Sequence, residues 1–322
     1  MSVETLLGGG LAGVLGLWAT RAASHRRSER ELREQARSGN TVFDLGDGRV
    51  EYRTWGADHR DGPIVVCENG LGAPLECWDW VAEALSSSTS VVAYHRAGYG
   101  ATTATSDPGA LIQGILRREF DGSRPVVLLA HSIGGMAVRA ALAHTPDLAR
   151  RVVGVCLVDS TDPSLLDAVW SDPERRGRIM QSMHLEMVGA VLGTTTVANP
   201  VLDEVDHRSS VQQRFARFVV DTRTVRTATR EYRRFSEAAS ALSRSPLPPT
   251  LVLSASNSHE GSTAHMRAQR SLADGLGATH QVVHGAGHRS ILGFRRHAET
   301  VADQLERWYT GTCVRSVEEV AS

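Results

Sequence analysis

Residues 126–136 read VVLLAHSIGGM, and this stretch decides the fold. An apolar, strand-like run stops at Ser132, which has small residues two positions before it (Ala130) and two positions after it (Gly134). Small neighbours let the chain turn sharply from a strand into a helix, so that the serine Oγ projects from the turn and the helix N-terminus faces any anion forming beside it. The stretch predicts a nucleophile elbow at Ser132. A strand-to-helix turn with an incidental serine fits the same short pattern.

A second motif lies far downstream, where residues 281–289 read QVVHGAGHR. It is typical of a short strand that runs into a glycine-rich loop ending at His288. A hydroxyl is a poor nucleophile until a neighbouring imidazole takes its proton, and a histidine titrates near neutrality. His288 is therefore the predicted general base. His131 and His284 are local competitors, and because His131 adjoins Ser132 in sequence we expect its side chain to point elsewhere.

A third strand-like run, residues 152–159 (VVGVCLVD), ends at the carboxylate of Asp159. An acid at the end of such a strand can orient the imidazole of a serine triad. The order of the three groups along the chain is serine, acid, histidine. This is the α/β-hydrolase order, and it differs from the orders of the other common serine triads.

On these motifs the chain resembles the α/β-hydrolase superfamily over residues 40–310, in particular esterases and lipase-like enzymes with a helical lid. Residues 63–72 (PIVVCENGLG) resemble the family's strand and oxyanion loop. That resemblance implies that the backbone N–H groups of Leu71 and Ile133 hold the developing negative charge. Residues 91–100 (VVAYHRAGYG) resemble the family's next strand and its arginine-containing turn, for which we favour a structural role.

The chain departs from the family pattern at Ala130, where glycine is usual, and at His95, where aspartate is usual. Neither departure removes a catalytic group. The acid is less well defined, because many relatives place it after the following strand. There this chain offers only Glu260, slightly beyond the usual offset, whereas other relatives use the position of Asp159. We favour Asp159 over Glu260, with Asp162 third, since geometry and not position defines a triad.

The apolar runs alternate with helix-like segments, a pattern typical of a doubly wound, mostly parallel α/β sheet. The expected strands are residues 64–67, 91–94, 126–130, 152–158 and 251–254, and the expected helices are 78–85, 133–144, 264–276 and 294–309. Residues 42–45 and 49–55, joined by Asp47-Gly48, predict an opening hairpin. The long interval 163–245 lacks strand runs and is interpreted as a helical lid over the nucleophile.

These patterns divide the chain into an N-terminal segment (1–38), an α/β-hydrolase core (39–162 and 246–311), the lid (163–245) and a C-terminal tail (312–322). Within the first segment, residues 5–20 are uncharged and mostly apolar, and a basic stretch (21–37) follows. A membrane span needs about 20 residues, so this run is short. It is interpreted either as a membrane attachment, with the enzyme domain facing the cytoplasm, or as a loosely ordered extension.

The composition argues against some classes of function. With 41% apolar and 22% charged residues and a formal net charge of -1, the chain is typical of a globular protein and lacks the basic surface that binds nucleic acid. Its four cysteines, Cys67, Cys77, Cys156 and Cys313, have no close paired spacing. We therefore expect reduced thiols, no metal site and a cytoplasmic protein.

The sequence thus predicts a serine hydrolase that acts on a small-molecule acyl substrate and uses no cofactor. Ser132 attacks, His288 transfers the proton, Asp159 holds the imidazole, and the N–H groups of Leu71 and Ile133 receive the oxyanion. Thioester or amide cleavage is the nearest alternative. A catalytically silent protein that binds a small apolar ligand in the same pocket is the alternative from another class.

Overall fold

A computed structural model describes residues 39–59, 62–120, 124–192, 203–257 and 262–313. These residues form an eight-stranded sheet with the order β1-β2-β4-β3-β5-β6-β7-β8. The strands are β1 (Thr41–Asp44), β2 (Arg49–Trp55), β3 (Ile64–Glu68), β4 (Ser90–Tyr94), β5 (Val126–His131), β6 (Val152–Val158), β7 (Thr250–Ala255) and β8 (Thr279–Val283). Strands β1 and β2 pair antiparallel with each other, and β2 pairs antiparallel with β4, so the opening hairpin is confirmed. All pairs from β4 to β8 are parallel.

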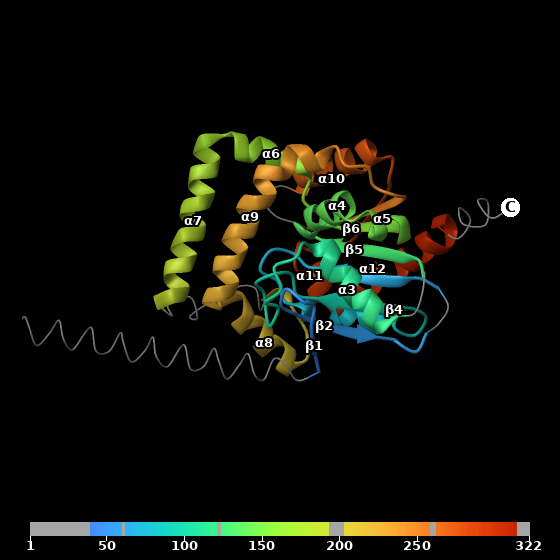
Figure 1. The fold of residues 1–322 in the computed structure, drawn as a ribbon. Coiled ribbons are helices and arrows are strands. Elements are labelled where there is room, and N and C mark those ends of the chain that lie inside the picture. Colours follow the sequence, from blue (N-terminus) through green and yellow to red (C-terminus); the bar gives the residue numbers. More distant parts are fainter. Residues whose placement is uncertain (1–38, 60–61, 121–123, 193–202, 258–261, 314–322) are drawn as a thin grey trace, which may run out of the picture.

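Helices cover both faces of this sheet (Figure 1). They are α2 (Asp79–Leu85), α3 (Pro108–Glu119), α4 (Gly134–His144), α5 (Pro146–Arg151), α10 (Ser262–Leu276), the short α11 (Ser290–Gly293) and α12 (Arg295–Trp308), with a 3-10 turn at Leu75–Trp78 and a π-helical turn at Tyr309–Cys313. On β3, Val65 belongs to the buried cluster that contains residues of α2 and α12, whereas its neighbour Val66 belongs to the cluster that contains residues of α3, α4 and α10. Successive strand residues point to opposite faces, and here both faces are buried, so the strands are continuously apolar. The predicted doubly wound, mostly parallel sheet is confirmed.

Between β6 and β7 the described residues form four inserted helices. They are α6 (Pro163–Ser171), α7 (Pro173–Leu192), α8 (Ser209–Val220) and α9 (Thr222–Ser243). Aspartate side chains cap three of them: Asp162 accepts from Ser164 N at α6, Asp172 from Glu174 N and Arg175 N at α7, and Asp221 from Thr224 N at α9. Helix α9 packs on α4 of the core, where Phe235 and Leu242 share a buried cluster with Met136. Figure 1 shows α7 running beside α9, on the far side of α9 from the sheet.

Two predicted segments fall outside the described residues. These are the whole N-terminal segment, including the proposed membrane attachment at 5–20, and the tail from residue 314 onward. Across the ranges that the structure describes, no helix combines the length and the apolar character needed to cross a bilayer.

Candidate active site

Ser132 occupies the sharp turn between β5 and α4. Its φ is 55°, in the left-handed region that costs a non-glycine residue about 1–3 kcal/mol. Two positions later, a Cβ on Gly134 would lie only 2.7 Å from the backbone oxygens of Glu68 and Asn69. Only glycine therefore lets the start of α4 pack directly against the end of β3. This contact holds the serine turn beside the loop that follows β3.

The structure brings together the three side chains that the sequence nominated as a triad. His288 lies in the loop after β8, and its Nε2 is 3.0 Å from Ser132 Oγ. On the other side of the ring, His288 Nδ1 is 2.6 Å from Asp159 Oδ2. The three residues follow the carboxyl ends of β5, β6 and β8, so the parallel strands deliver them to one edge of the sheet.

The carboxylate of Asp159 is fully buried and held at both oxygens. Its Oδ1 accepts a hydrogen bond from Ala255 N (2.9 Å), at the end of β7, and lies 2.7 Å from His265 Nε2. Burial alone would raise the pKa of Asp159, but the hydrogen bonds from His265 and His288 outweigh it and hold the pKa well below its usual range. Asp159 is therefore a carboxylate across the neutral pH range.

His265, on α10, was not among the residues that the sequence nominated. Its ring is about one-quarter exposed, and its bond to Asp159 raises the pKa of the imidazole. The chain order gave one indication of this contact, because α10 starts just after β7, at the same sheet edge as Asp159. Sequence alone does not give which turn of a helix faces a carboxylate, so the proximity appears only in the fold.

The alternative acids and bases have other positions. Asp162 caps α6, and Glu260 lies outside the described residues. His131 has its own partner: its Nε2 is 2.8 Å from the backbone oxygen of His288, its ring centroid lies 4.7 Å from that of His288, and burial lowers the pKa of its ring to about 3. A neutral His131 donates this bond and so holds the His288 loop. His284 is an exposed residue of that loop.

The two backbone amides that the sequence nominated as oxyanion donors are those of Leu71 and Ile133. Leu71 lies in the turn after β3, and Ile133 directly follows the serine. Within the part of the chain that the structure describes, neither Leu71 N nor Ile133 N donates to a backbone or side-chain acceptor. Amides that lack an acceptor and adjoin a serine hydroxyl are suited to receive an oxyanion.

A cavity of about 610 Å³ opens beside Ser132 and His288. Its wall combines core loops with the inserted helices. Apolar side chains from both parts line it, namely Leu71, Val205, Phe215, Val219, Val225 and Leu292. Polar side chains, among them Glu186, His207 and Arg289, complete the lining, and a mostly apolar cavity with a few polar groups is the usual form of a small-molecule site.

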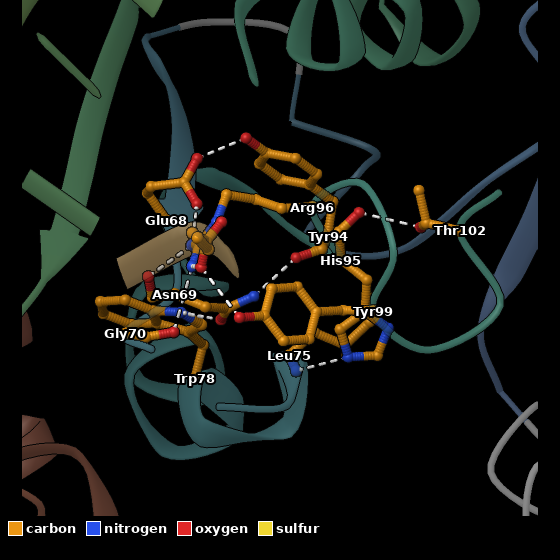
Figure 2. Close-up of polar contacts among 11 residues, drawn as sticks. Glu68, Asn69, Gly70, Leu75, Trp78, Tyr94, His95, Arg96, Tyr99 and Thr102 are labelled. Atoms are coloured by element: carbon orange, nitrogen blue, oxygen red, sulfur yellow. Dashed lines mark hydrogen bonds and ion pairs between the residues drawn. The ribbon is translucent and has the colours of Figure 1, made fainter. Parts of the chain in front are cut away.

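Arg96, in the turn after β4, donates hydrogen bonds to the backbone of the loop that carries Leu71. Figure 2 shows its guanidinium between Glu68 and the backbone of Asn69 and Gly70. Nη1 is 2.5 Å from Asn69 O, and Nη2 is 3.3 Å from Gly70 O. Two further bonds, at 2.7 and 2.6 Å, join Arg96 to both carboxylate oxygens of Glu231 on α9. All three charged side chains are buried, so the bonds are made without competing water.

His95, the departure from the family's aspartate, keeps a structural position. Its Nε2 accepts a hydrogen bond from Leu75 N (3.0 Å), so its Nδ1 carries the proton that faces Glu51 Oε2 at 2.9 Å. The ring also stacks on Phe218 of α8. Among the described residues, no group of three or more histidine, cysteine or acidic side chains has the arrangement needed to hold a metal ion.

Residues 64–304 match the model of the alpha/beta hydrolase family. The chain belongs to this family. Solved structures agree in fold: the Cif epoxide hydrolase from Acinetobacter nosocomialis has a TM-score of 0.64 at 12% identity, over 86% of this chain and 95% of that chain. A putative lipase (lip1) from Acinetobacter baumannii AYE has a TM-score of 0.57 at 15% identity, over 88% and 96%. An esterase from Thermogutta terrifontis has a TM-score of 0.52 at 16% identity, over 85% and 99%. Family and fold together indicate a hydrolase of the α/β class.

A curated relative gives a different kind of match. The chain is 25% identical over 135 residues to a probable transporter, efuK, from Hormonema carpetanum. The match covers 39% of this chain and 19% of that protein, so the chain spans about one-fifth of this relative's length.

Proposed function

We propose that this chain is a serine hydrolase that cleaves a carboxylic ester or a related acyl bond through an acyl-enzyme. The observation that carries the proposal is the pair of hydrogen bonds from Ser132 Oγ to His288 and from His288 to Asp159, beside an apolar cavity. A serine hydroxyl becomes a nucleophile when a hydrogen-bonded imidazole, itself oriented by a third group, accepts its proton.

In the first half of the reaction, Ser132 Oγ attacks the substrate carbonyl carbon and its proton passes to His288 Nε2. The carbonyl oxygen becomes an oxyanion, which the N–H groups of Leu71 and Ile133 receive. The intermediate collapses by breaking the bond to the leaving group, and His288 returns the proton to the departing alcohol oxygen. Asp159 stabilises the transient imidazolium and fixes its tautomer.

The second half repeats these steps with water as the nucleophile. His288 takes a proton from the water as it attacks the acyl-enzyme carbonyl, the same amides hold the new oxyanion, and His288 then protonates Ser132 Oγ. The acid leaves, and the free enzyme is restored. The cycle uses side chains, backbone amides and water alone.

Two features narrow the substrate. A serine at the elbow favours acyl chemistry over epoxide opening, for which family members use an aspartate nucleophile at this position. The apolar lining of the cavity favours an apolar acyl group. A serine triad can act on esters, thioesters and amides alike. Whether the leaving atom is oxygen, sulfur or nitrogen is therefore decided by an activity assay.

Turnover of p-nitrophenyl butyrate, butyryl-thiocholine and a p-nitroanilide tests the proposal. We expect the wild type to hydrolyse at least the ester and Ser132→Ala to lose that activity. The control Ser243→Ala, an exposed serine at the end of α9, should keep it. Thioester turnover without ester turnover would replace the ester by the alternative substrate. Binding of apolar ligands without any turnover would support the silent-receptor alternative and contradict the proposal.

A further inference from the structure

We propose that Arg96 is a positioning residue for the oxyanion hole and that Glu231, on the inserted helix α9, holds it in place. The inference rests on the proposed function, since it assigns a role toward the oxyanion donor Leu71. It starts from the turn after β4, whose resemblance to the family motif suggested only a structural role.

The argument begins with one peptide group. The carbonyl of Gly70 and the N–H of Leu71 belong to the same planar unit, and in a trans peptide these two bonds point in opposite directions. Arg96 Nη2 donates to Gly70 O (3.3 Å), and Nη1 donates to Asn69 O (2.5 Å). A cation that holds the carbonyl on one side therefore directs the Leu71 N–H to the other side. It also polarises the peptide, which makes that N–H a better donor.

The guanidinium is itself oriented from the inserted helices. Glu231 accepts from both Nε (2.7 Å) and Nη2 (2.6 Å) of Arg96, a planar two-point contact that fixes the guanidinium plane. Tyr99, in the same turn, donates its hydroxyl proton to Glu231 Oε2 (2.9 Å). Because Arg96 is 2% exposed, it has no water to replace these partners if one is lost.

The turn is also shaped to receive α9. Gly98 has φ +89°, and a Cβ at this position would lie 2.9 Å from Thr227 Cγ2. With glycine there, Thr227 Oγ1 approaches Gly98 O to 3.2 Å. The same stretch of α9 lines the cavity through Val225 and Ala228. One segment of the inserted helices thus faces the substrate cavity and holds the residue that orients an oxyanion donor.

Three variants test the inference. Arg96→Lys keeps the charge but loses the fork that reaches the two carbonyls. Glu231→Gln keeps the shape but weakens the two-point contact, and Tyr99→Phe removes one bond to Glu231. The matched control is Arg139→Lys, a buried arginine of α4 that donates to Leu242 O at the other end of α9 and to Ser245 O just after that helix. It is a similar buried link that does not contact the oxyanion loop.

Each protein is titrated with a fluorophosphonate, so that kcat is expressed per reactive serine. We expect kcat to fall about 10- to 100-fold in Arg96→Lys and by a smaller factor in Glu231→Gln, with KM within about threefold. Affinity for a trifluoromethyl ketone, whose serine adduct carries an oxyanion, should fall by the same factor as kcat. Arg139→Lys should keep both values. A purely structural role would lower the melting temperature and the number of reactive sites but leave kcat per site unchanged.

Wild-type kcat per site and ketone affinity in folded Arg96→Lys and Glu231→Gln would overturn the inference, as would an equal loss in Arg139→Lys. If Arg96→Lys does not fold, Glu231→Gln and Tyr99→Phe decide by the same criterion. A wild type that neither reacts with fluorophosphonate nor turns over an acyl substrate would contradict the proposed function instead, so the two failures are distinguishable.

Discussion

His265 Nε2 lies 2.7 Å from Oδ1 of Asp159, on the opposite side of the carboxylate from His288. One buried carboxylate therefore faces two imidazoles, one directed toward Ser132 and one, on α10, that is partly exposed. The second imidazole adds a hydrogen bond to those that Asp159 accepts from His288 and from Ala255 N. It also connects the buried acid to a group that exchanges protons with solvent.

The raised pKa of His265 predicts a pH-dependent contribution to stability. A histidine whose pKa is raised by folding stabilises the folded state fully below its unfolded pKa of about 6.5, and the contribution is lost as pH rises through the folded value. We expect the difference in free energy of unfolding between wild type and His265→Gln to be larger at pH 5.5 than at pH 9. Urea unfolding at the two pH values measures it. Equal differences at both would contradict the assigned charge interaction.

His131 predicts the opposite sign. Burial lowers its pKa to about 3, so below pH 6.5 the unfolded chain takes up a proton that the folded protein excludes. We expect this residue alone to reduce the free energy of unfolding by about 2 kcal/mol between pH 7 and pH 5. His131→Gln keeps an N–H donor for His288 O and does not titrate, so its stability should fall less over this interval. A variant that loses as much stability as wild type would refute the prediction.

The proposed acid is tested by three conservative substitutions. Asp159→Asn removes the charge that orients and stabilises the His288 imidazolium, so kcat should fall by about 10⁴-fold. Asp162→Asn should keep activity, because an asparagine also caps a helix. Glu260→Gln should keep it as well. The measurement is kcat per fluorophosphonate-reactive site, and loss of activity in Glu260→Gln alone would transfer the acid role to that residue.

Much of the fold could be predicted from sequence because the parallel strands are buried on both faces. Each central strand is a short apolar run bounded by turn residues, as in the strands at 126–131 and 152–158. Such a run can be identified from its own local sequence, without knowledge of its neighbours in the sheet. The positions of Ser132, Asp159 and His288 follow from the same logic, since parallel strands place their carboxyl ends at one edge. The distances between these side chains, and the choice of Asp159 among the three candidate acids, came from the structure.

The contacts that sequence did not give are those between helices and loops far apart in the chain. Arg96 and Glu231 pair across the boundary between core and insertion, and neither residue carries a local signal of the other. His265 reaches Asp159 only because α10 begins at the matching sheet edge. Such pairs depend on how amphipathic helices rotate when they pack, which the periodicity of each helix leaves undetermined.

The cavity lining predicts that a residue of α9 limits the length of the acyl chain. Ala228, on α9, lines the cavity, and a Cβ on Gly72 would lie 3.6 Å from the Ala228 Cβ. A phenyl ring here should fill space beside the oxyanion loop. We therefore expect Ala228→Phe to lower kcat/KM for p-nitrophenyl octanoate by about 10-fold or more and to leave the acetate ester within about threefold.

The control for this variant is Ala241→Phe, an exposed position at the end of the same helix, which should leave both substrates unaffected. A parallel loss on acetate and octanoate in Ala228→Phe would indicate general disruption of the site. It would count against α9 as the wall that limits chain length.

The central claim is that the hydroxyl of Ser132 is the nucleophile, activated by His288 at 3.0 Å. Its most direct test is peptide mass spectrometry of the folded protein after reaction with a fluorophosphonate. We predict one adduct per chain, on the peptide that contains Ser132, and its absence in His288→Ala over the same reaction time. An adduct on another residue, or none on correctly folded wild type, would contradict the claim.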